Sequence, residues 1–244
     1  MKLFAFGSKS INDITDFTIR SVLDDAMDKG EEILVGDCSG ADAAIQKYLY
    51  DREYKSVTVY VSGDKVRNNI GGWDVRYVVF DPTLEGYDFY RQKDIQMELD
   101  CDYAAVVWDG KSKGTRQNII ELTALGKTIR NFAENEIENL FQIILHDDSI
   151  RIWLDDIRPS PYGYICCRSV KEAELIIRKA EQFGLTIVNI NCDHDLGIYA
   201  KLGGDGIKLL DFLVERGTFY HVFLHTMNPV GRQNMQNMID RYWK

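Results

Sequence analysis

The sequence predicts an α/β protein of two tandem domains, each a three-layer arrangement around a parallel sheet. Short apolar runs alternate with longer segments whose apolar residues recur at helical spacing, a pattern typical of parallel sheets with helices packed on their faces. The alternation occurs once before and once after an acidic segment at 134–149. A length of 244 residues allows one or two domains. We therefore predict a domain at 1–133, a linker at 134–149 and a domain at 150–244.

The first half contains short apolar runs that end in small or polar residues. Strands are expected at 2–6, 32–35, 56–61, 75–80 and 103–108, and a short segment at 128–132 closes the half. Helices are expected at 16–29, 39–50 and 89–99, and another begins at 118–125. These alternate along the chain, which predicts a mostly parallel sheet.

The second half repeats this order of elements. The linker carries one amphipathic stretch, Ile137 to Ile144. Strands are expected at 150–154, 164–167, 185–190 and 220–224, and helices at 170–183, 206–215 and 230–243. This half is therefore also predicted to be α/β.

Composition excludes several classes of protein. The net charge is −9, and both halves are acidic, with 17 basic and 22 acidic residues in 1–133 and 12 basic and 16 acidic residues in 134–244. Neither half has the positive electrostatic field that would attract nucleic-acid polymers or anionic membranes. No apolar run approaches a membrane span or a signal-peptide core, and the five cysteines contain no CxxC. We expect a cytoplasmic protein with reduced thiols that binds neither nucleic-acid polymers nor membranes.

Three strand ends in the first half are rich in glycine and small polar residues. They are Gly7-Ser8-Lys9-Ser10, Gly36-Asp37-Cys38-Ser39-Gly40-Ala41-Asp42 and Asp109-Gly110-Lys111-Ser112-Lys113-Gly114-Thr115. Ligands of open parallel sheets bind beyond such ends, and helix N-termini there attract phosphate. Turn chemistry alone explains one such loop but explains three less well. The loops match neither a dinucleotide fingerprint nor a Walker A motif.

Further motifs in this half resemble the SLOG superfamily, which includes YpsA-like, Lonely Guy and DprA-like proteins. The resemblance rests on residues 62–73, on Tyr90-Arg91-Gln92-Lys93-Asp94, and on Trp108 to Ile119. It implies a Rossmann-like domain that binds a nucleotide or an ADP-ribose-like derivative, and such domains often form homo-oligomers. The candidate nucleotide-binding residues are Gly7, Ser8, Lys9, Ser39, Gly40, Ala41, Asp42, Arg67, Asn68, Arg91, Asp109, Gly110, Lys113, Gly114, Thr115 and Asn118.

One departure from this superfamily affects the expected activity. Lonely Guy enzymes carry a glutamate where this chain has Asn118, which has no ionisable proton. Glu121 lies one helical turn further and is expected to face solvent or to pair with a lysine. This half is therefore interpreted as a binder or sensor, and N-glycosidic cleavage is a weaker third alternative. Arg67 and Arg91 are the candidate phosphate contacts because a guanidinium offers a planar fork of donors.

Acidic residues follow the strands of the second half. Asp155 and Asp156 follow the first strand, and Asp193 and Asp195 follow a later one. Two carboxylates about 5 Å apart repel by about 3 kcal/mol at an effective dielectric constant of about 20. Protonation or a cation is therefore expected at this edge. Oxygen ligands suit Mg²⁺ or Mn²⁺, so these four aspartates are the candidate metal ligands, although a capped turn with solvated carboxylates is the alternative.

The second half resembles a response-regulator receiver domain, and more closely its cyclic-phosphate processing variant. The resemblance rests on the segments 153–159, 192–197, 205–206 and 225–235. No receiver-type lysine follows a fifth strand, which argues against aspartyl-phosphate signalling. Candidate catalytic residues are Asp193, His194, His225, Asn228 and Arg232, because histidines move protons near neutral pH and Asn228 and Arg232 suit a phosphate.

Two functions from different classes remain. The preferred one is a metal-dependent phosphoesterase that hydrolyses a cyclic nucleotide or an ADP-ribose-derived phosphate. The other is a nucleotide sensor or sponge without turnover, in which the second half is an interaction module. The family resemblances suggest a setting in phage defence or nucleotide signalling, by analogy alone.

Overall fold

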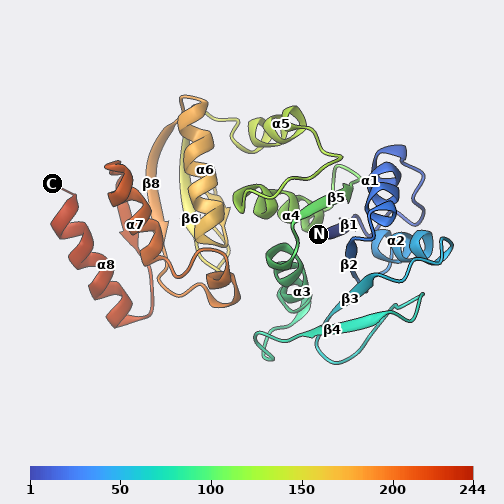
Figure 1. The fold of residues 1–244 in the computed structure, drawn as a ribbon. Helices are drawn as coiled ribbons and strands as arrows, with labels where there is room; N and C mark the ends of the chain where they lie inside the picture. Colours follow the sequence, from blue (N-terminus) through green and yellow to red (C-terminus); the bar gives the residue numbers. More distant parts are fainter. Residues whose placement is uncertain (244) are drawn as a thin grey trace. The chain divides into compact units, whose positions relative to one another are not determined.

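The computed structural model describes residues 1–243 and divides into two compact units, Met1–Glu134 and Asn135–Lys244. Each unit contains one parallel sheet, with five strands in the first and four in the second (Figure 1). The predicted α/β class with two tandem parallel sheets is confirmed. No helix in the described part of the chain is long and apolar enough to cross a membrane.

The N-terminal unit is built on a sheet of strand order β4-β3-β2-β1-β5. The strands are β1 (Lys2–Gly7), β2 (Glu32–Gly36), β3 (Val57–Ser62), β4 (Asp74–Val78) and β5 (Tyr103–Val107). The helices are α1 (Phe17–Asp28), α2 (Ala41–Tyr50), α3 (Gly86–Asp100) and α4 (Lys113–Ala124). The predicted closing segment contributes one isolated bridge, between Ala104 and Ile129.

Both faces of this sheet are buried. Leu3 and Ala5 point from β1 into a core with Ile19 and Leu23 of α1, while the alternate residue Phe4 lines a pocket on the other face. Successive side chains of a strand point to opposite faces, so a run that is apolar throughout requires cover on both sides. This explains why β1 is almost continuously apolar.

Helix α4 begins five residues earlier than the apolar spacing predicts. The Ser112 side chain accepts a hydrogen bond from the backbone N–H of Thr115, which caps the helix. The first turn, Lys113 to Arg116, is polar and glycine-containing. Apolar periodicity cannot detect such a turn, whereas the cap serine marks where it begins.

The C-terminal unit has the strand order β7-β6-β8-β9. The strands are β6 (Ser149–Leu154), β7 (Ile165–Cys167), β8 (Thr186–Cys192) and β9 (Val222–Leu224). The helices are α5 (Glu134–Ile144), α6 (Val170–Gln182), the 3₁₀ helix η1 (Gly197–Lys201), α7 (Ile207–Arg216) and α8 (Pro229–Tyr242). Helix α5 occupies most of the segment predicted as a linker, and Leu140 and Phe141 bury its apolar stripe.

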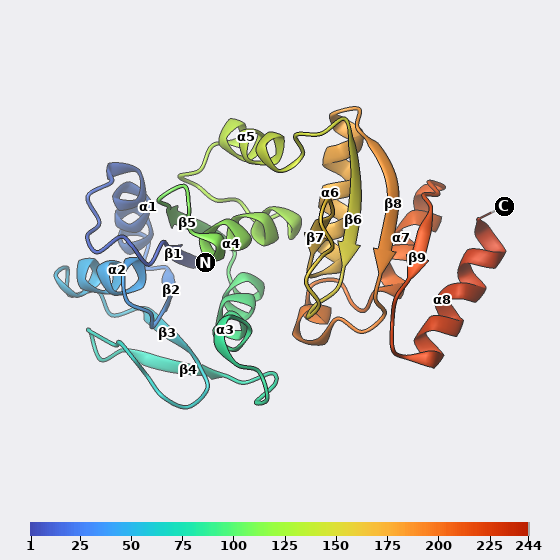
Figure 2. The same ribbon diagram turned by 180° about the vertical axis from the view of Figure 1, so that it is seen from behind.

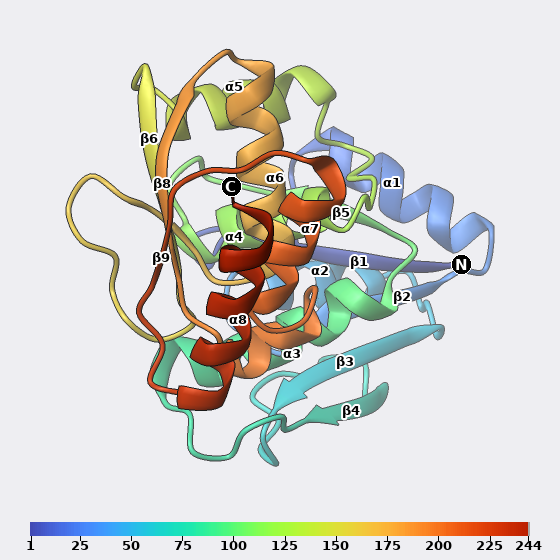
Figure 3. The same ribbon diagram turned by 90° about the vertical axis from the view of Figure 1, so that its left-hand side faces the viewer.

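The helices α6 and α7 lie against one face of this second sheet (Figures 1 and 3). Burial alternates along β6, where Ile150, Ile152 and Leu154 are buried while Ser149 and Arg151 are exposed. Seen from behind, the strands of this sheet lie in front of these helices (Figure 2). The sheet therefore has a helix-covered face and a face that stays partly open.

Candidate functional site

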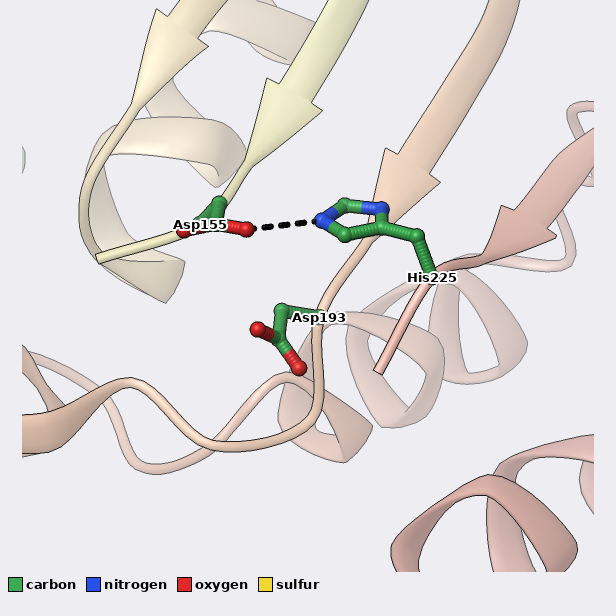
Figure 4. A group of neighbouring side chains, drawn as sticks. All are labelled: Asp155, Asp193 and His225. Atoms are coloured by element: carbon green, nitrogen blue, oxygen red, sulfur yellow. Dashed lines mark hydrogen bonds and ion pairs between the residues drawn. The ribbon is translucent and has the colours of Figure 1, made fainter. Parts of the chain in front are cut away.

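Three side chains converge at the carboxyl edge of the second sheet. Asp155 follows β6, Asp193 follows β8 and His225 follows β9, and these parallel strands are neighbours in the order β6-β8-β9. One ligand atom from each residue lies within 4.8 Å of the others (Figure 4). The predicted convergence of acids from distant stretches of chain is therefore present for Asp155 and Asp193, and His225 completes the group.

Arg158 supplies a positive charge between the two carboxylates. Its Nη1 lies 2.9 Å from Asp155 Oδ2 and 2.8 Å from Asp193 Oδ2, and it also donates to the His225 carbonyl at 3.3 Å. Asp155 is fully buried, whereas the Arg158 side chain is 39% exposed. Protonation or a cation was expected at this edge, and a residue of the chain itself supplies a positive charge there.

Asp155 also positions the imidazole of His225. His225 Nε2 lies 3.0 Å from Asp155 Oδ2, while Nδ1 is buried and has no hydrogen-bond partner. The Trp153 ring stacks on the imidazole at 4.0 Å with an interplanar angle of 11°. Burial lowers the pKa of His225 despite the neighbouring carboxylates, so the ring is largely neutral at pH 7. A neutral imidazole oriented by a carboxylate is suited to general base chemistry.

A second aspartate–histidine pair lies at the end of β8. His194 Nδ1 and Asp195 Oδ1 are 2.8 Å apart, and Asn228 Nδ2 donates to the same carboxylate oxygen at 3.0 Å. The hydrogen bond from His194 lowers the pKa of Asp195. A Cβ atom on Gly231 would lie 2.4 Å from His194 Cγ, so only glycine lets α8 approach the ring this closely. The tertiary structure therefore holds His194, Asp195 and Asn228 together.

Other predicted residues surround these pairs without joining the three-residue group. Burial, followed by the charges of Asp155 and Asp193, raises the pKa of Asp156 to about 6. Asn228 caps α8 by accepting the backbone N–H of Gly231. Arg232 is exposed, and its guanidinium donates to the Thr226 carbonyl at 3.4 Å.

A divalent ion fits the group of Asp155, Asp193 and His225 only if Arg158 moves. Carboxylate oxygens bind such ions at about 2.0–2.6 Å, which places the ion in the gap that the guanidinium fills. Two carboxylates and an imidazole suit Mn²⁺ better than Mg²⁺, which prefers oxygen ligands. Asp156 and Asp195, the other two predicted ligands, do not belong to this group.

The N-terminal unit contains a pocket of about 320 Å³ at the carboxyl ends of its strands. Of the predicted residues, Gly7, Lys9, Ser39, Asp42, Arg67, Gly114, Thr115 and Asn118 line it. Aromatic and apolar side chains complete the walls, namely Phe4, Phe6, Tyr87, Tyr90 and Met97. The pocket therefore combines an apolar wall with the glycine-bearing loops that the sequence singled out.

A buried lysine that sequence reasoning missed forms part of this pocket. Lys93 Nζ lies 2.6 Å from Asp94 and 3.8 Å from Asp42. Burial opposes the charge of Lys93, but these two carboxylates outweigh it and raise its pKa. Burial raises the pKa of Asp42 to about 6.

The Arg91 side chain is buried and does not line the pocket. Its guanidinium pairs with Glu98 at 2.8 Å, with Glu121 and with the Asn118 side chain, so those donors are already used. Glu121 is 1% exposed, and the expectation that it faces solvent or a lysine is wrong because Arg91 draws it into the interior. Asn118 is thus held by Arg91 at the pocket wall.

The remaining predicted loop residues stabilise the turns around this pocket. Arg67 pairs with the buried Asp37 and lies over the Tyr90 ring at 4.3 Å. Asn68 donates to the Asp37 carbonyl at 3.0 Å. Ser8 is buried and bonds Asp109 at 3.0 Å. Gly40, Ala41, Gly110 and Lys113 belong to the same loops and helix starts but do not line the pocket.

Comparison with known families supports the C-terminal resemblance. The model of the family described as "Cyclic-phosphate processing Receiver domain" matches residues 150–241. These residues include both aspartate–histidine pairs and Arg158. The C-terminal unit is therefore similar to receiver domains associated with cyclic-phosphate processing. Neither the curated proteins nor the solved structures gave a match.

Arg158 and Trp153 lie in the segment 153–159 that carries the receiver resemblance, but sequence reasoning gave them no role. An arginine two residues after a pair of aspartates is a usable signal, because a short loop can return its guanidinium to the same carboxylates. Trp153 had a weaker signal, since an aromatic residue within a strand is usually a core residue.

Proposed function

We propose that the C-terminal unit hydrolyses a cyclic phosphate ester of a nucleotide. The observation that carries the proposal is the meeting of Asp155, Asp193, His225 and Arg158 at one sheet edge, in a region that the cyclic-phosphate receiver family matches. Two histidines, each paired with an aspartate, provide the acid and the base that opening a cyclic phosphate requires.

Arg158 binds the phosphate in this proposal. Its Nη1 is held between the two carboxylates, and the partly exposed guanidinium presents further N–H groups outward. Guanidinium groups bind phosphate oxygens through paired hydrogen bonds. Asn228, at the start of α8, donates to Asp195 of the His194 pair, and Arg232 follows in the first turn of the same helix; both extend the phosphate site in this proposal.

The reaction adds one water molecule to the ester. One histidine removes a proton from water as its oxygen attacks phosphorus, and the bond from phosphorus to one ring oxygen breaks. The other histidine protonates that oxygen, which leaves a hydroxyl group and a phosphate monoester. If a divalent ion were held by Asp155, Asp193 and His225 instead, it would take the place of Arg158 in binding the phosphoryl oxygen, and His225 would be a ligand and not an acid or base.

The test is hydrolysis of 2′,3′- and 3′,5′-cyclic nucleotides, followed by ³¹P NMR with EDTA or with Mn²⁺ or Mg²⁺. Asp155→Asn is expected to lose at least about a hundredfold in kcat, because it weakens the hold on both His225 and Arg158. Arg178→Gln, whose side chain is 54% exposed on α6, is the control. Equal turnover by Asp155→Asn and the wild type would refute the proposal.

The N-terminal pocket supports a second function, nucleotide binding without turnover. Its apolar wall suits a base, and two helix N-termini at its rim suit phosphate. Asn118 stands where Lonely Guy enzymes carry an ionisable glutamate, and its amide cannot donate or accept that proton, which disfavours N-glycosidic cleavage. Mass spectrometry of small molecules released by heat from the purified protein tests this function. A nucleotide returned intact supports it, and free base would show glycosidic cleavage instead.

A further inference from the structure

The open face of the C-terminal sheet is unusual for parallel strands. Such sheets are nearly always covered on both faces. Here the register aligns Trp153 of β6 with Asn191 of β8 and Phe223 of β9, so these side chains share a face. Arg151 and Asn189, two residues earlier on β6 and β8, are paired with each other and lie on the same face. We call these five residues the open face. Phe223 is 47% exposed and Arg151 is also exposed, so this face is accessible.

The open face is continuous with the candidate active site. Trp153 stacks on His225, whose other contact is Asp155. Tyr164 closes one side of the tryptophan, with its ring edge-on at 6.0 Å and its hydroxyl 3.0 Å from Asn191 Nδ2. A molecule that reaches His225 therefore meets this aromatic surface.

Unpartnered polar atoms mark the same surface. Trp153 Nε1, Asn189 Oδ1 and His225 Nδ1 are buried without hydrogen-bond partners. Buried polar groups normally have partners, so one donor and two acceptors without any, all on β6, β8 and the residue after β9, point to a ligand. Planar ligands with both donors and acceptors at their edge, such as nucleobases, match this set.

Charge also favours a nucleotide over an acidic or strongly cationic partner. The strands β6, β7, β8 and β9 contain no aspartate or glutamate, although the chain carries a net charge of −9. The charged residue of the open face is Arg151. Aromatic side chains on a sheet with a nearby cation are a common platform for stacked bases.

We propose that the open face binds the aromatic base of the substrate, so that the C-terminal unit processes nucleoside cyclic phosphates in preference to cyclic phosphates without a base. This inference rests on the proposed function and deepens it. It places base recognition within the C-terminal unit, independently of the N-terminal pocket.

Two measurements on the full chain test it. The first compares kcat/KM for 2′,3′-cyclic AMP with that for glycerol 1,2-cyclic phosphate, which lacks a base. Phe223→Ala and Asn191→Ala are expected to lower this ratio about tenfold, because a stacked base contributes that much or more. Ile143→Ala, an exposed apolar residue of α5, is the control and should leave the ratio unchanged.

The second measurement does not depend on turnover. Titration with 3′-AMP should quench tryptophan fluorescence, and the part of the quenching lost in Trp153→Phe reports binding at the open face. Quenching of Trp153 without hydrolysis would refute the proposed function and support base binding. Hydrolysis with an unchanged ratio in both variants would refute base binding alone. A wild-type dimer that Phe223→Ala converts to a monomer in light scattering would assign the face to a second copy and overturn the inference.

Discussion

Replacing Arg158 with glutamine removes the positive charge from between two buried carboxylates. At 2.8–2.9 Å and an effective dielectric constant of about 20, each charge pair interacts by about 6 kcal/mol before solvent is considered. Because the Arg158 side chain is 39% exposed, water screens much of this energy. We expect Arg158→Gln to lower the free energy of unfolding of the C-terminal unit by about 2–3 kcal/mol, somewhat less than the loss of a fully buried partner.

The same change should strengthen metal binding. Arg158 and a divalent ion compete for the oxygens of Asp155 and Asp193, so removal of the arginine should raise Mn²⁺ affinity by about ten- to a hundredfold. Mn²⁺ at a hundred times its Kd would then return about 2.7 kcal/mol of stability. Isothermal titration calorimetry and thermal unfolding with and without Mn²⁺ measure both effects.

Arg178→Gln provides a matched control. Arg178 pairs with Glu174 on the surface of α6 at 3.3 Å, and its loss should cost less than about 1 kcal/mol. If Arg158→Gln is as stable as this control and binds Mn²⁺ no better than the wild type, the assignment of Arg158 as the resident cation is wrong.

Three further outcomes are expected. Burial raises the pKa of Asp42 to about 6 from 3.8, so the folded state binds the proton more tightly than the unfolded state. The free energy of unfolding of the wild type should therefore fall as pH rises from about 4 to 6, by up to about 3 kcal/mol. Urea unfolding should show a flatter pH dependence in Asp42→Asn, and an unchanged pH dependence would mean that Asp42 is not its source. Gly231→Ala should lower kcat for cyclic nucleotides by about tenfold or more through displacement of His194, while unchanged kcat would remove His194 from the reaction. Ser169→Ala removes the cap of α6 and should cost about 1–2 kcal/mol in thermal unfolding, and a loss below about 0.3 kcal/mol would mean that the cap contributes little.

Much of the fold could be predicted because buried residues of helices and strands recur at regular spacing along the sequence. The continuous apolar runs of β1 and β5 follow from cover on both faces of the first sheet. The less regular starts of α4 and α5 were harder to place, because polar first turns carry no apolar period. At the candidate site, Asp155 and Asp193 could be brought together from topology alone, because neighbouring parallel strands end at the same edge.

The choice among adjacent residues could not be made in this way. Asp155 and Asp156 follow the same strand, yet only Asp155 joins Asp193, because successive side chains leave the backbone in different directions. For the same reason, the sequence interpretation did not include the ion pairs of Arg158 with Asp155 and Asp193. In the first unit, Arg91 was expected to contact a phosphate, but its guanidinium is buried and paired with Glu98 and Glu121, which compensate its charge inside.

By itself the sequence determined the order of strands and helices, the division into two α/β halves and the strand ends at which polar residues collect. These features depend on local periodicity and on the connections between consecutive elements, both of which are visible in the sequence. The tertiary structure decided which cation lies between Asp155 and Asp193, which imidazole joins them and which face of the second sheet stays open. Those outcomes depend on side-chain direction and on packing between residues distant along the chain, which local periodicity does not show.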